Sequence, residues 1–349
     1  MDYPHIMAIG TAIPPYALRQ EEIKEFAAAL FQTKLEHLER VLPVFTNGMI
    51  QVRHLSRPLS WYQEVHSFAE ANKVYEEMAI NLAEEAAAKA IAQADINPDE
   101  IGMVIFISST GIATPTVDAK IIQSLGLSPH TVRVPIWGLG CAGGVSGLAR
   151  AAELAQVLNG KAVLLIAVEL CSLTFQRNDY SKANLVGTSL FSDGAAAVLI
   201  GVNASDGPAV CGSYSTLFPA TEDIMGWDIT DTGLKVQFSR DIPSIVRRYL
   251  PKLTGKACES WDIDIASVHH YVVHPGGAKV LNAYADSLRL SLDKLEHAYR
   301  VLASYGNMSS VSVLFVLESF LTDTQPTGQY GLMLALGPGF SAEQVLFRW

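Results

Sequence analysis

The stretch Gly138-Leu-Gly-Cys-Ala-Gly-Gly144 sets a single cysteine among four glycines, and an alanine-rich segment follows it to about Asn159-Gly160. This pattern predicts a helix that begins beside Cys141 and ends at the Asn-Gly stop. Buried strands are predicted on either side of it, over 104–107 and 162–168. The order of strand, cysteine turn, helix and strand is typical of an α/β unit.

A second unit with the same order follows later in the chain. A strand over 270–273 ends at His274, the turn Ser304-Tyr-Gly-Asn-Met-Ser-Ser310 opens an apolar helix to about Thr322, and a strand covers 331–336. Thirty-three residues separate Ser108 from Cys141, and thirty-three separate His274 from Asn307. Helices are predicted ahead of both units, over 82–94 and 242–250.

The repeated order predicts a duplicated βαβ unit with strands buried on both faces and helices between the layers. One half would span 1–205 and the other 206–349, with the seam near Asn203 to Pro208. Two βαβ stretches can also look alike by chance.

Three polar residues lie at the turns where these elements meet. The helix start beside Cys141 predicts a lowered thiol pKa, because unpaired amides and the helix dipole favour a thiolate; the alternative is a buried cysteine used as a small apolar side chain. His274, at a strand end, could transfer a proton or be a core histidine bonded to a carbonyl. Asn307 could donate to an oxyanion or cap the next helix. Their equivalent places in the two units favour a joint chemical role.

Composition excludes several classes of function. The 349 residues are 49% hydrophobic and 17% charged, which is typical of a compact globular enzyme. A net charge of -10 and the lack of a basic arm argue against nucleic-acid binding. We expect no secretion signal and no stable membrane insertion, and hence a cytoplasmic protein. The four cysteines form no CxxC pair, so neither a zinc site nor a disulfide framework is predicted.

Seven segments together resemble the chalcone and stilbene synthase-like type III polyketide synthases over nearly the whole chain. They are Ala8-Ile-Gly-Thr-Ala12, Met49-Ile50, Gly140-Cys-Ala-Gly-Gly144, Leu190-Phe-Ser-Asp-Gly-Ala-Ala196, His274-Pro-Gly-Gly277, Tyr305-Gly-Asn-Met-Ser-Ser310 and Gly337-Pro-Gly339. The resemblance implies a homodimer with a thiolase-like α/β fold, in which the duplicated βαβ halves form a layered αβαβα architecture.

The resemblance also implies the reaction. Cys141 would accept a starter acyl group from acyl-CoA, while His274 and Asn307 would bind malonyl-CoA and stabilise the enolate left when carbon dioxide departs. Repeated attack of this enolate on the acyl-cysteine would give a poly-β-keto chain that closes to a pyrone or resorcinol-type ring. No metal or organic cofactor is implied. Fatty acyl starters and alkylpyrone products are expected for a bacterial-style member.

A substrate cavity is implied as well. Phe191 matches the aromatic residue where the CoA tunnel meets the cavity, although ordinary core packing would also explain it. Thr114 falls where the family inserts a residue from the partner subunit. Val236 and Trp227 replace a second gatekeeping aromatic and a frequent glycine of plant members, so a plant phenylpropanoid substrate is not expected. The other aligned cavity positions are Thr110, Cys171, Thr174, Ser309, and the floor residues Gly337 and Pro338.

The CoA site is less well matched. The basic residues expected before Met49 are mostly absent, which leaves Arg40 with Arg53 and Lys279 for the CoA phosphates, beside Gly276 and Gly277. Solvated surface charge is the alternative for the three cations. Rival functions are a ketoacyl synthase III-like enzyme that condenses once, a thiol hydrolase, and a non-catalytic thiolase-fold partner.

Overall fold

Nine strands form one central sheet in the computed structural model, which describes residues 3–32, 35, 38–202, 207–323 and 325–349. They are β1 (His5–Ala12), β4 (Ile101–Ile107), β5 (Val132–Ile136), β6 (Ala162–Leu170), β7 (Asp193–Gly201), β8 (Ala209–Leu217), β11 (Val268–Val273), β12 (Tyr330–Gly337) and β13 (Ser341–Arg348). Their order in the sheet is β11-β12-β13-β8-β1-β7-β6-β4-β5. Two short antiparallel sheets of two strands pair β2 (Tyr16–Arg19) with β3 (Val52–Leu55), and β9 (Met225–Thr230) with β10 (Gly233–Phe238).

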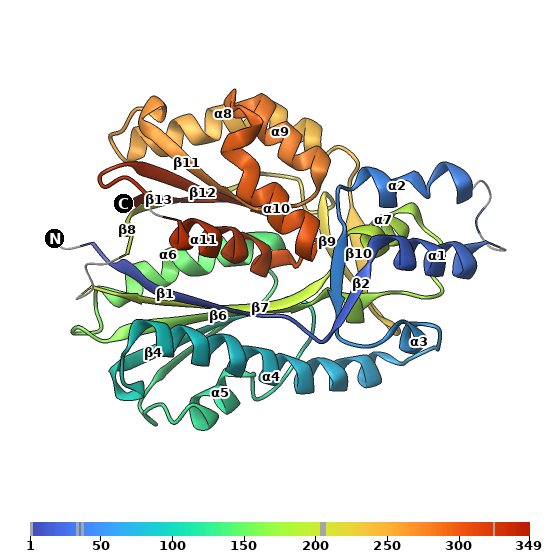
Figure 1. The fold of residues 1–349 in the computed structure, drawn as a ribbon, viewed down its shortest axis with the longest axis horizontal. Coiled ribbons are helices and arrows are strands. Elements are labelled where there is room, and N and C mark those ends of the chain that lie inside the picture. The colour runs from blue at the N-terminus through green and yellow to red at the C-terminus, as the bar shows by residue number, and fades with distance from the viewer. Residues whose placement is uncertain (1–2, 33–34, 36–37, 203–206, 324) are drawn as a thin grey trace.

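Helices cover both faces of this sheet and fill the space between its halves. They are α1 (Gln20–Phe31), α2 (Pro43–Asn47), α3 (Leu59–Tyr62), α4 (Phe68–Ala94), α5 (Asp118–Ser124), α6 (Gly143–Ala155), α7 (Lys182–Leu190), α8 (Ile242–Ser260), α9 (Ala278–Leu288), α10 (Glu296–Tyr305) and α11 (Ser312–Thr322). Of these, α1, α2, α3 and α7 lie beyond one end of the sheet, around the two short sheets (Figure 1). Figure 1 shows α8 and α9 above one half of the sheet, α6 and α11 between the halves, and α4 and α5 below the other half. The layered αβαβα architecture is therefore confirmed.

The two predicted βαβ units are both present. β4 pairs with β6 in parallel, and β11 pairs with β12 in parallel. Between the strands, each unit enters its central helix through a short 3₁₀ turn, Gly140–Ala142 before α6 and Ser309–Val311 before α11. The two units thus place Cys141 and Asn307 at matching turns.

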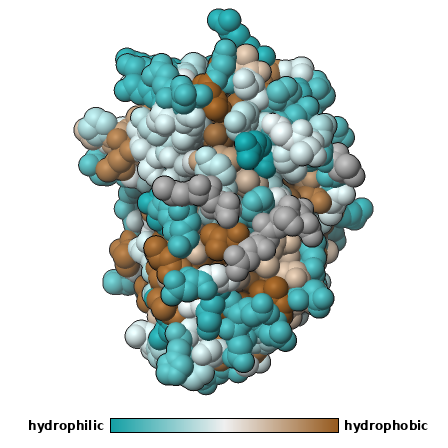
Figure 2. All heavy atoms as spheres, turned by 90° about the vertical axis from the view of Figure 1, so that its left-hand side faces the viewer, coloured by the Kyte–Doolittle hydropathy of each residue, from teal (hydrophilic) through white to brown (hydrophobic). Residues whose placement is uncertain are grey.

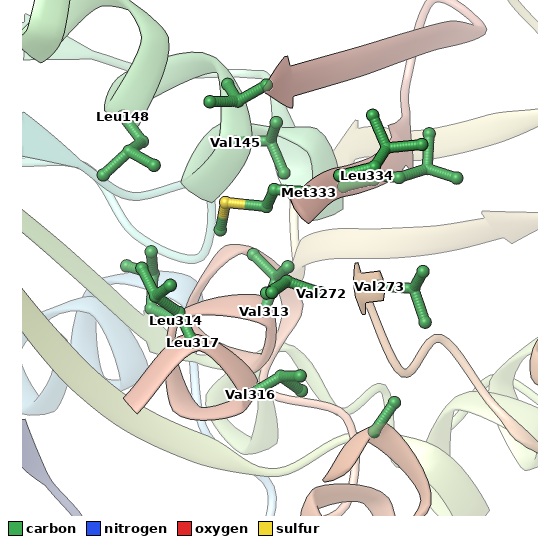
Figure 3. Packing of buried hydrophobic residues seen from close by; sticks show 14 of the residues in the cluster. Val145, Leu148, Val272, Val273, Val313, Leu314, Val316, Leu317, Met333 and Leu334 are labelled. Atoms are coloured by element: carbon green, nitrogen blue, oxygen red, sulfur yellow. The ribbon is translucent and has the colours of Figure 1, made fainter. Parts of the chain in front are cut away.

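The starts of α6 and α11 pack without space for a side chain. A Cβ placed on Gly144 would lie 2.2 Å from the carbonyl oxygen of Ser310 and 2.8 Å from Cγ1 of Val313. Beyond this contact, apolar side chains of the two helices fill the space beneath β11 and β12, including Val145, Leu148, Val313 and Leu317 (Figure 3). This dry core fixes the two turns relative to one another.

Several predicted boundaries differ from the structure. α4 begins at Phe68 and not near Leu82, because Ser67 and Glu70 form a capping box that opens the helix fourteen residues earlier. α8 continues through Pro251 to Ser260, although proline removes a backbone donor and predicted an end at residue 250. α6 ends at Ala155, short of the predicted stop near 160. The predicted seam includes residues 203–206, which lie outside the described residues.

The surface at the end of the molecule where both termini lie is largely polar. In Figure 2, teal and white residues surround small, separate brown patches. Scattered apolar residues of this kind are normal on a globular protein. Within the described ranges, no helix has both the length and the apolar character needed to cross a membrane.

Replacing Gly144 with alanine should destabilise the fold by about 1–3 kcal/mol, because the new methyl group overlaps the Ser310 carbonyl. Urea unfolding followed by circular dichroism would measure the change. Gly255→Ala in α8 is the matched control, since nothing lies within 4 Å of its added Cβ. That control should stabilise the helix by about 0.5–1 kcal/mol. Equal stability of the two variants would contradict the close approach of α6 and α11.

Candidate active site

Cys141 lies in the tight turn before α6, with its side chain 6% exposed. Gly140 adopts a φ of +46°, and a Cβ there would lie 2.8 Å from Cδ of Pro338. A Cβ on Gly337 would lie 2.6 Å from Cβ of Ala142. Gly337 and Pro338 therefore pack directly against the cysteine turn. Glycine is needed at both 140 and 337, because a side chain at either position would overlap the opposite segment.

The pKa of the Cys141 thiol is raised, whereas the sequence predicted that it would be lowered. Burial raises this pKa to about 12, while hydrogen bonds from the side chains of Ser309 and Asn307 oppose the rise. The sequence showed the helix start but not the depth at which it lies. Desolvation of the thiolate outweighs the favourable amides, so the thiol is neutral at pH 7.

Asn307 is held by two hydrogen bonds within a buried turn. Its Oδ1 accepts from the Ser309 amide at 2.8 Å, and its Nδ2 donates to the Gly276 carbonyl at 3.2 Å. The backbone of Asn307 also bridges to Phe191. The helix-cap alternative is met in part, because the Oδ1 bond caps the 3₁₀ turn that begins at Ser309, while α11 itself begins at Ser312. The same side chain holds its Nδ2 on the side of Gly276 and reaches the Cys141 thiol.

His274 directly follows β11 and is 3% exposed. Its backbone amide donates to Leu334 at 2.9 Å, but neither ring nitrogen has a hydrogen-bond partner among the described residues. A Cβ placed on Gly276 would lie 3.5 Å from Nε2, so the ring lies beside the residue that Asn307 holds. Burial lowers the pKa of His274 to about 3, which leaves the imidazole neutral. The alternative of a core histidine bonded to a carbonyl is thus contradicted.

Glu169 is a buried carboxylate that the sequence reasoning missed. It accepts from the Ser109 amide at 2.9 Å, the Thr110 hydroxyl at 3.0 Å and the Ser310 hydroxyl at 2.6 Å. These bonds join the end of β4, the end of β6 and the turn before α11. The signal was available, because a glutamate inside an otherwise apolar strand is itself informative.

A cavity of about 50 Å³ lies beside Phe191. Of the predicted cavity residues, it is lined by Cys171, Thr174, Phe191 and Val236. Trp227 pairs across β9 and β10 with Val236, and its ring lies 6.0 Å from that of Phe191. Trp227 thus packs beside Val236 and Phe191 and does not itself line the cavity.

The remaining predicted positions lie elsewhere. The Thr110 hydroxyl is engaged by Glu169, Ser309 lies at the Cys141 thiol, and Thr114 is exposed on the loop before α5. Gly277 precedes α9 with a φ of +146°. In the part of the chain that the structure describes, no group of three or more His, Cys, Asp or Glu side chains could hold a metal ion.

The three cations assigned to CoA do not form one surface cluster. Arg40 and Lys279 are exposed. Arg53 is only 2% exposed and lines the cavity beside Phe191, so its assignment to the CoA phosphates is wrong. The physical reason is that β3 turns this side chain inward, where its Nη1 donates to the Phe191 carbonyl at 2.8 Å.

Comparisons with known proteins agree on one family. Models described as "Chalcone and stilbene synthases", N-terminal and C-terminal domains, match residues 3–204 and 210–349. The chain is 42% identical to the "Putative chalcone synthase" of Bacillus subtilis (strain 168), over 99% of this chain and 98% of that protein. It is 37% identical to the 1,3,6,8-tetrahydroxynaphthalene synthase of Streptomyces peucetius subsp. caesius, over 99% and 93%. The crystal structure of 1,3,6,8-tetrahydroxynaphthalene synthase from Streptomyces coelicolor has a TM-score of 0.92 at 28% identity, over 99% of each chain.

Replacing Glu169 with glutamine should change how stability depends on pH. Burial raises the pKa of Glu169 from 4.5 to about 7, so the folded protein binds this proton more tightly than the unfolded chain. The stability that this group contributes is present below pH 4.5 and is lost as pH rises through 7. The Glu169→Gln variant has no carboxyl group at this position to lose a proton. Its free energy of unfolding should therefore rise relative to that of the native protein by about 3 kcal/mol between pH 5 and 8. Denaturant unfolding across this range would measure the difference, and parallel curves would contradict the assignment.

Proposed function

The chain belongs to the chalcone and stilbene synthase family, the type III polyketide synthases, and from this premise we propose how Cys141, His274 and Asn307 perform its condensation reaction. Enzymes of this kind are acyltransferases that condense CoA thioesters. In this proposal Cys141 is the acyl acceptor, and His274 and Asn307 serve both loading and extension. One observation supports it: His274 is a buried imidazole whose two ring nitrogens are free of partners among the described residues, and its ring lies beside Gly276, to which the carboxamide of Asn307 is bonded. The side chain of Asn307 also reaches the Cys141 thiol.

Loading requires a base, and His274 is in the correct form to be one. Because burial keeps the imidazole neutral, its unprotonated nitrogen can accept the Cys141 proton as the sulfur attacks the thioester carbonyl. The thiolate need form only as its proton moves to His274, because the pKa of Cys141 is about 12. The acyl group passes to sulfur, and the CoA thiolate leaves with the proton that His274 had accepted.

Extension requires hydrogen-bond donors, and the same two side chains supply them. The N–H of neutral His274 and the Nδ2 of Asn307 would both donate to the carbonyl oxygen of the malonyl thioester. Loss of carbon dioxide leaves an enolate whose negative oxygen these donors stabilise. The enolate carbon then attacks the acyl-cysteine, a carbon–carbon bond forms, and the Cys141 sulfur leaves. Neither step needs a metal or organic cofactor.

The product is proposed to be a pyrone or resorcinol-type ring. Relatives at 37% and 28% identity are named for tetrahydroxynaphthalene and phloroglucinol, which are ring products, and this supports cyclisation of a poly-β-keto chain. The fatty acyl starter and alkylpyrone product stay predictions. Mass spectrometry of products from malonyl-CoA with short, aromatic and long-chain starters tests them. A single condensation that requires acyl carrier protein would favour the ketoacyl synthase III alternative.

Two variants should separate chain extension from the decarboxylation of malonyl-CoA. Cys141→Ala should lose chain extension by more than about 10³-fold and keep malonyl-CoA decarboxylation, because the enolate donors remain. Asn307→Ala should lower decarboxylation by about 10²–10³-fold, because one donor to the developing enolate is removed. Release of labelled carbon dioxide and mass spectrometry of products would measure both.

Cys211→Ala is the matched control for the thiol, since Cys211 lies on β8, half-buried and with no role in the proposal. It should match the native enzyme in both assays. Full extension by Cys141→Ala would remove that residue from the reaction, and unchanged carbon dioxide release by Asn307→Ala would remove the proposed donor.

The protein is also proposed to be a homodimer, in the cytoplasm, with CoA thioesters as its ligands. β5 is an edge strand of the central sheet, and Val132, Trp137 and Ile112 expose 47%, 49% and 45% of their surface beside it. An unpaired edge with large apolar residues is a surface that proteins normally cover. Thr114 lies on the adjoining exposed loop.

Sedimentation velocity should therefore give a dimer. Val132→Lys should yield a folded monomer, because the charge would be buried in the partner contact but is solvated in the single chain. Thr230→Lys, on the short β9–β10 sheet, is a control that should remain dimeric. A native protein that sediments as a monomer at micromolar concentration would contradict this interface.

A further inference from the structure

A short backbone bridge fixes the main chain of Asn307. The Asn307 amide donates to the Leu190 carbonyl at 3.0 Å, and the Asn307 carbonyl accepts from the Ser192 amide at 2.9 Å. These two bonds form an isolated bridge in which Asn307 faces Phe191. Isolated pairing of this kind is weak by itself. The position of Asn307 therefore depends on what holds the segment 190–192 from its other edge.

Arg53 holds that other edge. It lies on β3, is 2% exposed, and its Nη1 donates to the Phe191 carbonyl at 2.8 Å. The next residue of β3 anchors the same segment, because the Ser192 hydroxyl accepts from the His54 amide at 2.8 Å and donates to the His54 carbonyl at 3.0 Å. β3 is thus fixed to two successive residues of the segment that pairs with Asn307.

The methylene groups of Arg53 contact the other partner of the bridge. A Cβ placed on Gly306 would lie 2.9 Å from Cγ and 3.1 Å from Cδ of Arg53, and 3.2 Å from the Leu190 carbonyl oxygen. Gly306 has a φ of +70°, which favours glycine, and it directly precedes Asn307. One side chain therefore contacts both partners of the bridge, with its guanidinium on Phe191 and its methylenes on Gly306.

Stability alone does not explain an arginine at this place. Among the described residues the guanidinium makes one hydrogen bond, to a neutral carbonyl, while Nε and Nη2 have no partner. Burial lowers the pKa of Arg53 to about 9, so the buried group is still a cation at neutral pH. Apolar side chains of similar volume are often as stable as buried charged groups, or more stable. The arginine is thus better explained by the geometry that it imposes.

We propose that Arg53 is a positioning residue, which sets the place of the Asn307 carboxamide by holding the bridge from both partners. The inference rests on the proposed function, in which Nδ2 of Asn307 donates to the developing enolate oxygen. The carboxamide is directed by its bond to the Gly276 carbonyl and by the backbone that carries it. A displacement of about 1 Å in such a group can lower a rate by about 10²-fold.

A double-mutant cycle tests this role. Arg53→Met keeps most of the methylene chain and removes the donor to Phe191. It should lower kcat for malonyl-CoA decarboxylation by about 10- to 100-fold and leave KM nearly unchanged. In the Asn307→Ala background the same change should have almost no further effect, because the donor that Arg53 positions is already absent. Release of labelled carbon dioxide by the native enzyme, both single variants and the double variant would measure the coupling.

Two further measurements separate positioning from general loosening of the fold. Alkylation of Cys141 by iodoacetamide should keep its native rate in Arg53→Met, because Gly337 and Pro338 hold the cysteine turn independently of the bridge. The midpoint of urea unfolding should stay near the native value. Equal losses of alkylation and decarboxylation would overturn the proposal. So would a full further loss when Arg53→Met is added to Asn307→Ala.

Two other arginine variants complete the design. Lysine carries its donor on a flexible chain without the planar fork, so Arg53→Lys should decarboxylate at a rate between those of the native enzyme and Arg53→Met. Arg247→Met removes an exposed arginine that pairs with Asp286 and should match the native enzyme in every assay.

If Arg53→Met does not fold, Arg53→Lys carries the same cycle. A lowered rate whose effect disappears in the Asn307→Ala background supports the positioning role, and a native rate or effects that multiply overturn it. A native rate in Asn307→Ala would instead contradict the proposed function, because the donor itself would be unused. A defective Asn307→Ala beside a native rate in the Arg53 variant would overturn the positioning role alone.

Discussion

The contact between the starts of α6 and α11 is the constraint on which the rest of the site depends. Two βαβ units of equal order place their central helices side by side, and the carbonyl of Ser310 occupies the space where Gly144 would carry a side chain. Any larger residue there would move the cysteine turn away from the asparagine turn. Because both turns belong to the same dry layer, their separation is set by core packing and not by the loops themselves.

Glu169 adds a third segment, the loop that follows β4, to the two turns that this contact holds. Its carboxylate lies at the end of β6; one oxygen accepts from Ser109 and Thr110 in the loop after β4, and the other accepts from Ser310 in the turn before α11. A buried carboxylate is normally unfavourable, and its raised pKa records that penalty. The same bonds orient the turn that carries Asn307. The Glu169 carboxylate therefore holds these segments in position, and its burial lowers the stability of the fold near neutral pH.

The sequence was sufficient to predict the two βαβ units and insufficient to predict the burial and the pKa shifts of the residues at the site. Element order and the glycine-rich turns predicted both βαβ units, because close helix contacts need glycine and buried strands need apolar runs. Depth of burial is a property of the whole fold, so the direction of the Cys141 pKa shift was wrong. Arg53 was assigned to the surface for the same reason, since a single arginine on a short strand does not reveal which face is buried.

Buried groups without partners connect the chemistry to the energetics of the fold. His274 leaves two ring nitrogens unbonded and Arg53 leaves two donor groups unbonded within the described residues, and each such group costs about 1–3 kcal/mol when nothing replaces water. A fold built only for stability would have bonded or replaced them. The carbonyl oxygen of a bound thioester would accept from the N–H of His274 and satisfy one of these groups. Substrate binding would then recover energy that folding left unused.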